Sequence, residues 1–208
     1  MLDVWLGTSK SAKQSIGKAI GTVKKAIVLD DTYAEAHGLL GFLYSIIKKY
    51  DQGIAQGEKA VALNPNSGYA HFILGKVLTF ASRWEESIPH YKIAVRLDPI
   101  PSNNYLFSLG LSYGYTGQYD EAIKWSEKAI RQEPNSLLAR LFMAQVYSWS
   151  GQDEKARLEA AEVLMINPKF SLKKWEKKLK YKNQENNERV INALRKAGLK
   201  WWETGNFN

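Results

Sequence analysis

The pattern of apolar and polar positions from Asn103 to Pro134 predicts two consecutive amphipathic helices. In each half of this stretch an apolar or small residue recurs every three or four positions, which is the spacing of one helical face. The first face comprises Leu106, Leu109, Gly110 and Tyr113, and the second comprises Ala122, Ile123, Ser126, Ala129 and Ile130. Gly117-Gln118 is the expected turn between them. Pro134 ends the second helix, because proline cannot continue the helical hydrogen-bond ladder.

This two-helix pattern recurs with a period of 34 or 35 residues. Three series share the period, namely Gly41, Gly75, Gly110 and Ala144; Ala60, Ala94, Ala129 and Val163; and Pro65, Pro99, Pro134 and Pro168. A helix pair this short cannot bury its apolar face alone, so neighbouring pairs must stack into one continuous core. We expect full repeats at residues 34–67, 68–102, 103–136 and 137–170.

Both ends of the chain depart from the repeat pattern. Residues 1–33 form a partial unit, because its second helix fits the register while its first helix would begin near residue 0 and be interrupted after Leu6-Gly7. This truncation suggests a fragment of a longer chain. At the other end, residues 171–200 lack the repeat spacing and are expected to form two capping helices, the second from Gln184 to Ala197 with Gly198 as its stop. Residues 201–208 form a short tail.

The order of small and large residues in each repeat resembles the tetratricopeptide repeat (TPR) family. The resemblance covers roughly residues 12–168 and is carried by small residues such as Gly110, Ala122 and Ala129, by the aromatic Tyr113 and by Pro134. It implies an all-α fold, a TPR helix-turn-helix solenoid wound as a right-handed superhelix, here with a C-terminal helical cap. The resemblance is specific for the fold and weak for function, because such repeats are scaffolds for many binding surfaces.

Composition and charge limit the kinds of partner and the cellular location that we expect for the chain. The net charge is +8, but residues 169–208 hold eleven Lys/Arg and four Glu, so the repeats themselves are nearly neutral. The basic extension is expected to be a solvated helix face, with an acidic partner or an anionic membrane surface as alternatives. Nucleic acid is not expected as a partner. No apolar run is long enough to span a membrane, and the absence of cysteine fits a cytoplasmic protein.

No arrangement of residues predicts catalysis, a metal site or a cofactor. Of the three histidines, His37, His71 and His90, the first two occupy the same position in successive repeats and are expected to pack in the core. One histidine from each of two repeats lacks the carboxylate or cysteine set that would complete a site. We therefore expect a protein that is not an enzyme and that binds a protein or peptide partner.

The TPR resemblance implies a concave groove lined by the first helix of each repeat. The residues that it places there are mostly aromatic or aliphatic: Phe42, Ile46, Tyr69, Phe72, Lys76, Phe80, Asn104, Phe107, Leu111, Tyr115, Leu138, Leu141, Gln145 and Trp149. Few are polar, which argues against a clamp for a carboxylate terminus. The groove is expected to bind a partner peptide, a partner helix or a second copy of the chain. Alternatively, tight curvature or the chain's own tail covers this surface.

Three longer stretches suggest a closer resemblance within the TPR family. They are DVWLG near the start, LDPIPSNNYLFSLGLSYGYTGQYDEAI in the middle and NPKFSLKKWEKKLKYKNQENNERVINALRKAGL near the end. Together they resemble the C-terminal TPR region of bacterial class III adenylate/guanylate cyclases and of related regulators with a DNA-binding domain. This resemblance implies a regulatory region of a larger signalling protein, or a dimerisation module for an attached cyclase or DNA-binding domain.

Overall fold

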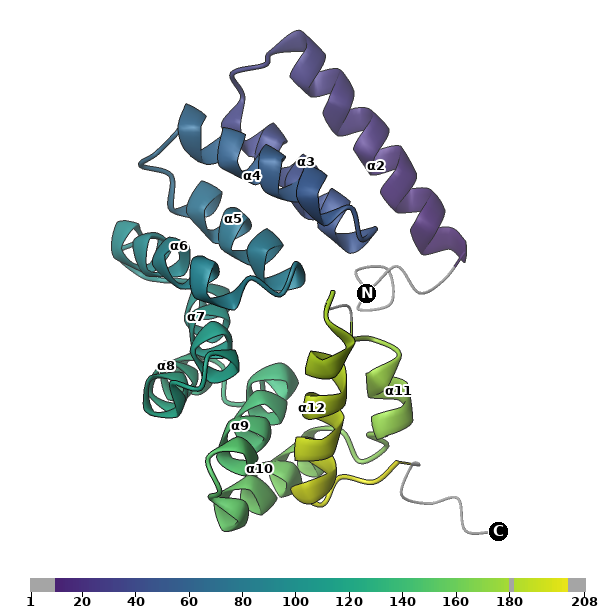
Figure 1. Cartoon of the computed structure of the whole chain (residues 1–208), viewed down its shortest axis with the longest axis vertical. Coiled ribbons are helices and arrows are strands. Elements are labelled where there is room, and N and C mark those ends of the chain that lie inside the picture. The colour runs from purple at the N-terminus through teal and green to yellow at the C-terminus, as the bar shows by residue number, and fades with distance from the viewer. Residues whose placement is uncertain (1–9, 180–181, 202–208) are drawn as a thin grey trace. The chain divides into compact units, whose positions relative to one another are not determined.

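The computed structural model describes residues 10–179 and 182–201, and every regular element in these ranges is a helix. The all-α prediction is thus confirmed. The expected interruption of the first helix and all but the first residue of the tail lie outside the described residues. The helices are α2 (Lys10–Leu29), α3 (Ala34–Ile46), α4 (Tyr50–Leu63), α5 (Gly68–Phe80), α6 (Trp84–Leu97), α7 (Asn103–Tyr115), α8 (Tyr119–Gln132), α9 (Leu137–Trp149), α10 (Asp153–Ile166), α11 (Leu172–Glu176) and α12 (Gln184–Lys196) (Figure 1).

Helices α3 to α10 form four pairs, and we call the first helix of each pair helix A and the second helix B. Each A helix has 13 residues and each B helix has 14. The turn between them places one residue at positive φ, at the same repeat position each time: Lys48 (63°), Ser82 (62°), Gly117 (80°) and Gly151 (76°). This left-handed residue ends the A helix and reverses the chain into the B helix.

Small residues set the close approach of A and B helices. A Cβ atom built on Gly41 in α3 would lie 2.8 Å from the carbonyl oxygen of Gly53 in α4. One built on Gly110 in α7 would lie 2.6 Å from Ser126 Oγ in α8. The repeating small residues of the B helices are buried completely at Ala60, Ala94 and Ala129. The 34-to-35-residue periodicity of small residues therefore reflects contacts between helices.

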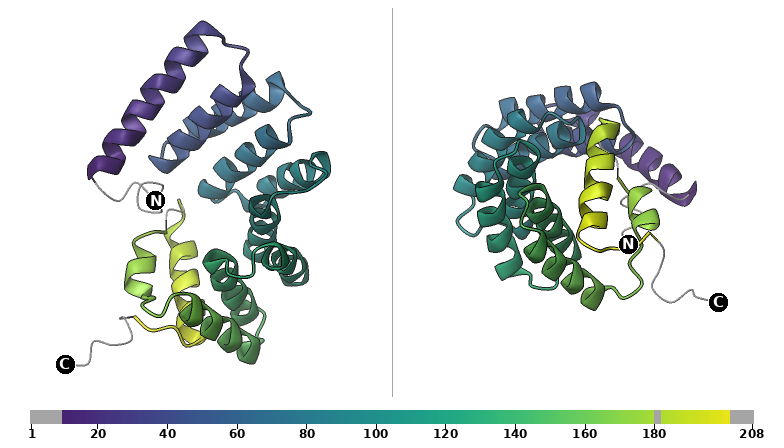
Figure 2. Two further views of the ribbon diagram at one scale, coloured as in Figure 1. Left: turned by 180° about the vertical axis from the view of Figure 1, so that it is seen from behind. Right: turned by 60° about the horizontal axis from the view of Figure 1, so that its bottom comes forward.

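The chain divides between Tyr105 and Leu106 into two compact units, which we call unit 1 and unit 2. In unit 1, α2 packs on α3 through Ile16 and Val23, which meet Leu40 and Leu43 (Figure 2, left). Helix α5 contacts both α3 and α4. In unit 2, α9 contacts α8, α10 and α12.

A pair of polar side-chain contacts, which we call the polar clasp, recurs near the start of three A helices. In α3 the buried His37 places Nε2 3.0 Å from the Asp31 carbonyl oxygen, six residues earlier, and Nδ1 2.7 Å from the Gln56 side-chain amide, nineteen residues later. The same offsets recur in two other repeats. His71 meets the Pro65 carbonyl and His90, and Arg140 meets the Pro134 carbonyl and Glu159.

The segment after α10 forms two helices of unequal length. Ser171 caps α11 by accepting a hydrogen bond from the Lys174 N–H, as expected for a helix that starts here. α11 has only five residues and is shorter than the lysine-rich run suggested, although Leu172 is completely buried. α12 begins at Gln184 and ends before Gly198, whose φ is 100°.

Candidate functional site

The A helices of unit 1 bring several of the predicted groove residues together. Phe42 of α3 lies beside Phe80 of α5, with ring centroids 6.1 Å apart. Phe72 of α5 lies against Tyr105, with centroids 4.4 Å apart and the ring planes tilted by 33°. The side chains of Ile46 and Phe80 are half-buried, and Tyr69 is 40% exposed. Phe42 and Phe72 themselves are buried, each 8% exposed. The groove positions of α3 and α5 thus form an aromatic surface whose exposed part comes from Ile46, Tyr69 and Phe80.

Lys76 lies in the middle of this aromatic surface. Its Nζ atom is 4.9 Å from the centroid of the Phe42 ring and 5.4 Å from that of Phe72. Burial lowers the pKa of Lys76 from 10.5 to about 8. Ring contacts of this kind favour the charged form by about 0.5–1 kcal/mol each, whereas a shift of this size corresponds to about 3 kcal/mol. Desolvation is therefore the stronger effect at this ammonium group.

The pKa of Lys76 predicts how stability depends on pH. Between pH 8 and 10.5 the unfolded chain binds a proton at Lys76 that the folded chain has released, so the free energy of unfolding rises with pH in this window. Lys76→Met removes this dependence, and the stability difference between variant and wild type should change by up to about 3 kcal/mol across the window. Urea denaturation at several pH values between neutrality and the upper end of this window measures it. Lys59→Met, at an exposed lysine of α4, is the control; parallel pH profiles for all three proteins would contradict the prediction.

The remaining groove residue of unit 1 lies at the start of α7. Asn104 is exposed, and its backbone N–H donates to Ser102 Oγ at 3.3 Å. Its neighbour Tyr105 was not predicted as a groove residue, although its ring contacts that of Phe72. The pKa of Tyr105 is raised by burial first, and then by Asp98 and Tyr69. Tyr105 therefore extends the aromatic surface of unit 1.

The groove positions of unit 2 also range from buried to exposed. Leu141 is completely buried, and Gln145, 5% exposed, donates its side-chain amide to the Leu141 carbonyl oxygen at 3.1 Å. Tyr115 is also buried, whereas Phe107, Leu111 and Trp149 are half-buried and Leu138 is 43% exposed. Only part of the predicted groove is thus available at the surface of this unit.

Aromatic contacts connect α7 and α9 in unit 2. The Phe107 and Phe142 rings meet edge to face with centroids 5.8 Å apart, and Tyr115 and Trp149 do the same at 5.1 Å. Edge-to-face pairs of this kind are favourable beyond the area that they bury. Phe142 is a core residue that the groove register does not include, and its ring also contacts that of Trp149, with a centroid distance of 6.4 Å.

α12 lies against this part of unit 2 and beside α9 (Figure 2, right). Its Arg189 contacts both Trp149 and Tyr115, two of the predicted groove residues. Sequence reasoning treated this helix as an end cap and did not single out Arg189. α12 thus covers the predicted groove at these two residues. The tail, which was the other cover expected for this surface, lies outside the described residues apart from Trp201.

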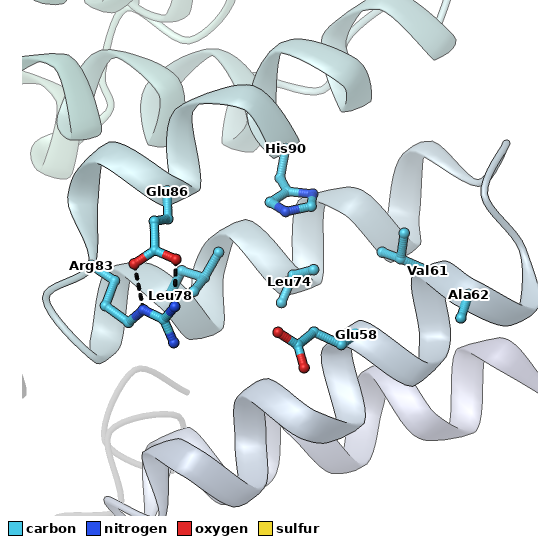
Figure 3. Close-up of a pocket in the computed structure, with 8 residues that line it drawn as sticks. All are labelled: Glu58, Val61, Ala62, Leu74, Leu78, Arg83, Glu86 and His90. Carbon is cyan, nitrogen blue, oxygen red and sulfur yellow. Dashed lines mark hydrogen bonds and ion pairs between the residues drawn. The ribbon is translucent and has the colours of Figure 1, made fainter.

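A separate pocket of about 300 Å³ lies among α4, α5 and α6 in unit 1 (Figure 3). It contains none of the predicted groove residues. Its lining consists of Glu58, Val61, Ala62, Leu74, Leu78, Arg83, Glu86 and His90. Arg83 and Glu86 form an ion pair across one edge of it. Because both side chains are largely exposed, this pair contributes little to stability.

His90 links this pocket to the polar clasp of its repeat. Its Nδ1 lies 3.0 Å from Nδ1 of the buried His71, whose Nε2–H donates to the Pro65 carbonyl oxygen. Burial lowers the pKa of His90, and the neighbouring His71 adds to this effect. The two imidazole rings and the Pro65 carbonyl oxygen thus form one hydrogen-bonded chain. No group of three or more metal-ligating side chains occurs in the part of the chain that the structure describes, where no helix could cross a membrane either.

Comparisons with known proteins agree with the helical-repeat interpretation. Residues 34–67 and 116–174 match family models described as tetratricopeptide repeat, and no curated protein matches the chain. Similar solved structures include MamA, with 26% identity over 77% of this chain and 93% of that one and a TM-score of 0.62. YrrB, described as a TPR protein with an unusual peptide-binding site, has 20% identity over 84% and 90% and a TM-score of 0.60. A thermophilic TPR protein from Thermus thermophilus has 19% identity over 92% and 97% and a TM-score of 0.65.

The helix pairs with their common turn geometry, the two family models and the solved structures together support the tetratricopeptide repeat family for this chain.

Proposed function

We propose that the chain is a non-catalytic cytoplasmic scaffold that binds a peptide or helix of a partner protein on the apolar groove face of its A helices. The observation that carries this proposal is the aromatic surface of unit 1, where the half-buried rings of Phe80 and Tyr105 contact the buried rings of Phe42 and Phe72 across neighbouring helices. Tyr69 remains 40% exposed at its edge. Aromatic clusters of this kind are typical centres of protein interfaces.

The area of such rings is sufficient for specific binding. Burying an aromatic side chain removes about 150–250 Å² from water, and apolar burial is worth about 25 cal/mol per Å². Two or three partly exposed rings could therefore contribute several kcal/mol before the cost of ordering a peptide is subtracted. The printed description of YrrB, a similar fold with a peptide-binding site, is consistent with this use of the fold.

The test is a selection of peptides from a random display library against the full-length chain. Enriched peptides are synthesised, and their dissociation constants are measured by fluorescence anisotropy. We expect Tyr69→Ala combined with Phe80→Ala to weaken binding at least tenfold, which is about 1.4 kcal/mol. Leu158→Ala is a matched control, because Leu158 is 68% exposed on α10 and is not a groove position. Equal affinities for the wild type and the groove variant would refute the proposal.

We further propose that this scaffold is a regulatory region of a larger signalling protein, on the resemblance to the C-terminal regions of class III cyclases. An open reading frame upstream of Met1 that encodes a cyclase or DNA-binding domain would support this role. In that context the repeats could also pair two copies of the attached domain. Light scattering tests the pairing, since a monomer mass at every concentration would exclude it.

A further inference from the structure

α12 packs on unit 2 by its apolar side, in the way that a bound ligand helix would. Its apolar side consists of Val190, Ile191, Ala193 and Leu194, each no more than 4% exposed. It packs on α9, an A helix whose predicted groove positions include Trp149. At its far end, Lys196 Nζ lies 2.8 Å from Asp153 Oδ1. An amphipathic helix laid on a surface by its apolar side is a common mode of peptide recognition.

Arg189 anchors this helix at the ends of two A helices. Its guanidinium carbon lies 4.2 Å from the centroid of the Trp149 ring. Its Nη2 donates to the Tyr119 hydroxyl at 3.1 Å, and its Nη1 donates to the Tyr115 carbonyl oxygen at 3.4 Å. In return, Trp149 Nε1 donates to the Arg189 carbonyl oxygen at 3.5 Å. The arginine thus combines ring stacking with two hydrogen bonds.

Two of these contacts, those with Trp149 and Tyr115, lie at predicted groove positions. The other two, with Tyr119 and Asp153, lie at the first residues of α8 and α10. Tyr115 and Trp149 are the last residues of α7 and α9, at equivalent points of successive repeats. Arginine and tryptophan are enriched among residues that dominate binding energies at interfaces, and arginine stacked on an aromatic ring adds a favourable cation–π contact. The contacts of α12 therefore indicate which side chains a helix needs in order to bind this surface.

We propose that the Tyr115–Trp149 surface of unit 2 is a receptor for an amphipathic helix that carries an arginine followed by an apolar turn, as in Arg189-Val190-Ile191 and Leu194. α12 is its internal occupant, and a partner helix of the same pattern binds by displacing it. This inference rests on the proposed scaffold function and names the partner chemistry for unit 2. The aromatic surface of unit 1 remains a separate site.

The experiment uses the full-length chain and a labelled peptide of residues 182–200. The double variant Arg189→Ala, Leu194→Asp weakens the packing of α12 against α9 of the same chain. We expect this variant to bind the peptide at least tenfold more tightly than the wild type does, as measured by anisotropy. The peptide with alanine at the position of Arg189 should bind at least tenfold more weakly than the unchanged peptide. Equal binding to both proteins, or no binding to a variant whose circular dichroism remains helical, would overturn the inference.

A second measurement covers the case in which the double variant unfolds. Hydrogen exchange of the wild-type chain should show amides of α12 exchanging faster than those of α9 and α10, because displacement requires α12 to open locally. Exchange of all three helices at one common rate would overturn the inference. If the library peptides bind the wild type and the unit 1 groove variant equally, the scaffold proposal for unit 1 is refuted. The peptide of residues 182–200 tests unit 2 alone. The two negative results can therefore be told apart.

Discussion

Replacing Leu141 by alanine is expected to lower the free energy of unfolding by about 3 kcal/mol, even though its sequence position suggests a groove residue. The Leu141 side chain is completely buried in α9, so truncation leaves a cavity in unit 2. Urea denaturation followed by circular dichroism measures the loss. Leu138→Ala, one turn earlier in the same helix, is a matched control, because Leu138 is 43% exposed. It should cost about 1 kcal/mol or less.

The comparison between the two leucines separates packing from binding. If Leu141 lined an open groove, its truncation would leave stability almost unchanged and would weaken only the binding of a ligand. Similar losses of stability for Leu138→Ala and Leu141→Ala would show that the burial of α9 differs from that described above.

Gly41→Ala is expected to destabilise the chain by about 2 kcal/mol, although alanine is the better helix former. The new methyl group would lie 2.8 Å from the Gly53 carbonyl oxygen and 3.1 Å from the Gly57 nitrogen, both backbone atoms of α4. Neither atom can move without separating α3 from α4. Thermal or urea denaturation provides the measurement.

Gly21→Ala is the control for this substitution. Gly21 lies within α2, and a Cβ atom there would meet nothing within 4 Å. Alanine should therefore stabilise α2 by about 1 kcal/mol through helix propensity alone. Stabilisation by both substitutions would mean that the contact between α3 and α4 is looser than the structure shows.

The helices could be predicted from the sequence because their signals are local. The periodic apolar faces and small residues define the helix pairs, and Gly198 marks the end of α12 as expected. α11 is the exception. Its lysine-rich run favours a helix by composition, but the regular helix ends at Glu176 and the Lys178 N–H bonds to the Trp175 carbonyl in a turn. Propensity alone was insufficient to extend it.

The groove could be predicted only as a set of positions, since exposure depends on contacts between distant segments. Arg189 lies 40 residues from Trp149 and 74 from Tyr115. No local pattern marks such a pair. The same holds for His71 and His90, which are on different helices and meet because α5 and α6 pack together. The repeat register placed His71 in the core, where it is found, but did not indicate its neighbour.

The polar clasp has a consequence for how such a chain can change by duplication, deletion or exchange of repeats. Both side chains of each clasp, such as His71 and His90 or Arg140 and Glu159, lie within one repeat. The preceding repeat contributes only a main-chain carbonyl oxygen, which any residue supplies. A whole repeat can therefore be copied or moved with its side-chain partners intact, and its new neighbour need not match it in sequence at this point. Recombination within a repeat, between the A and B helices, would instead mix the pairs and leave a buried histidine or a half-buried arginine facing the wrong group.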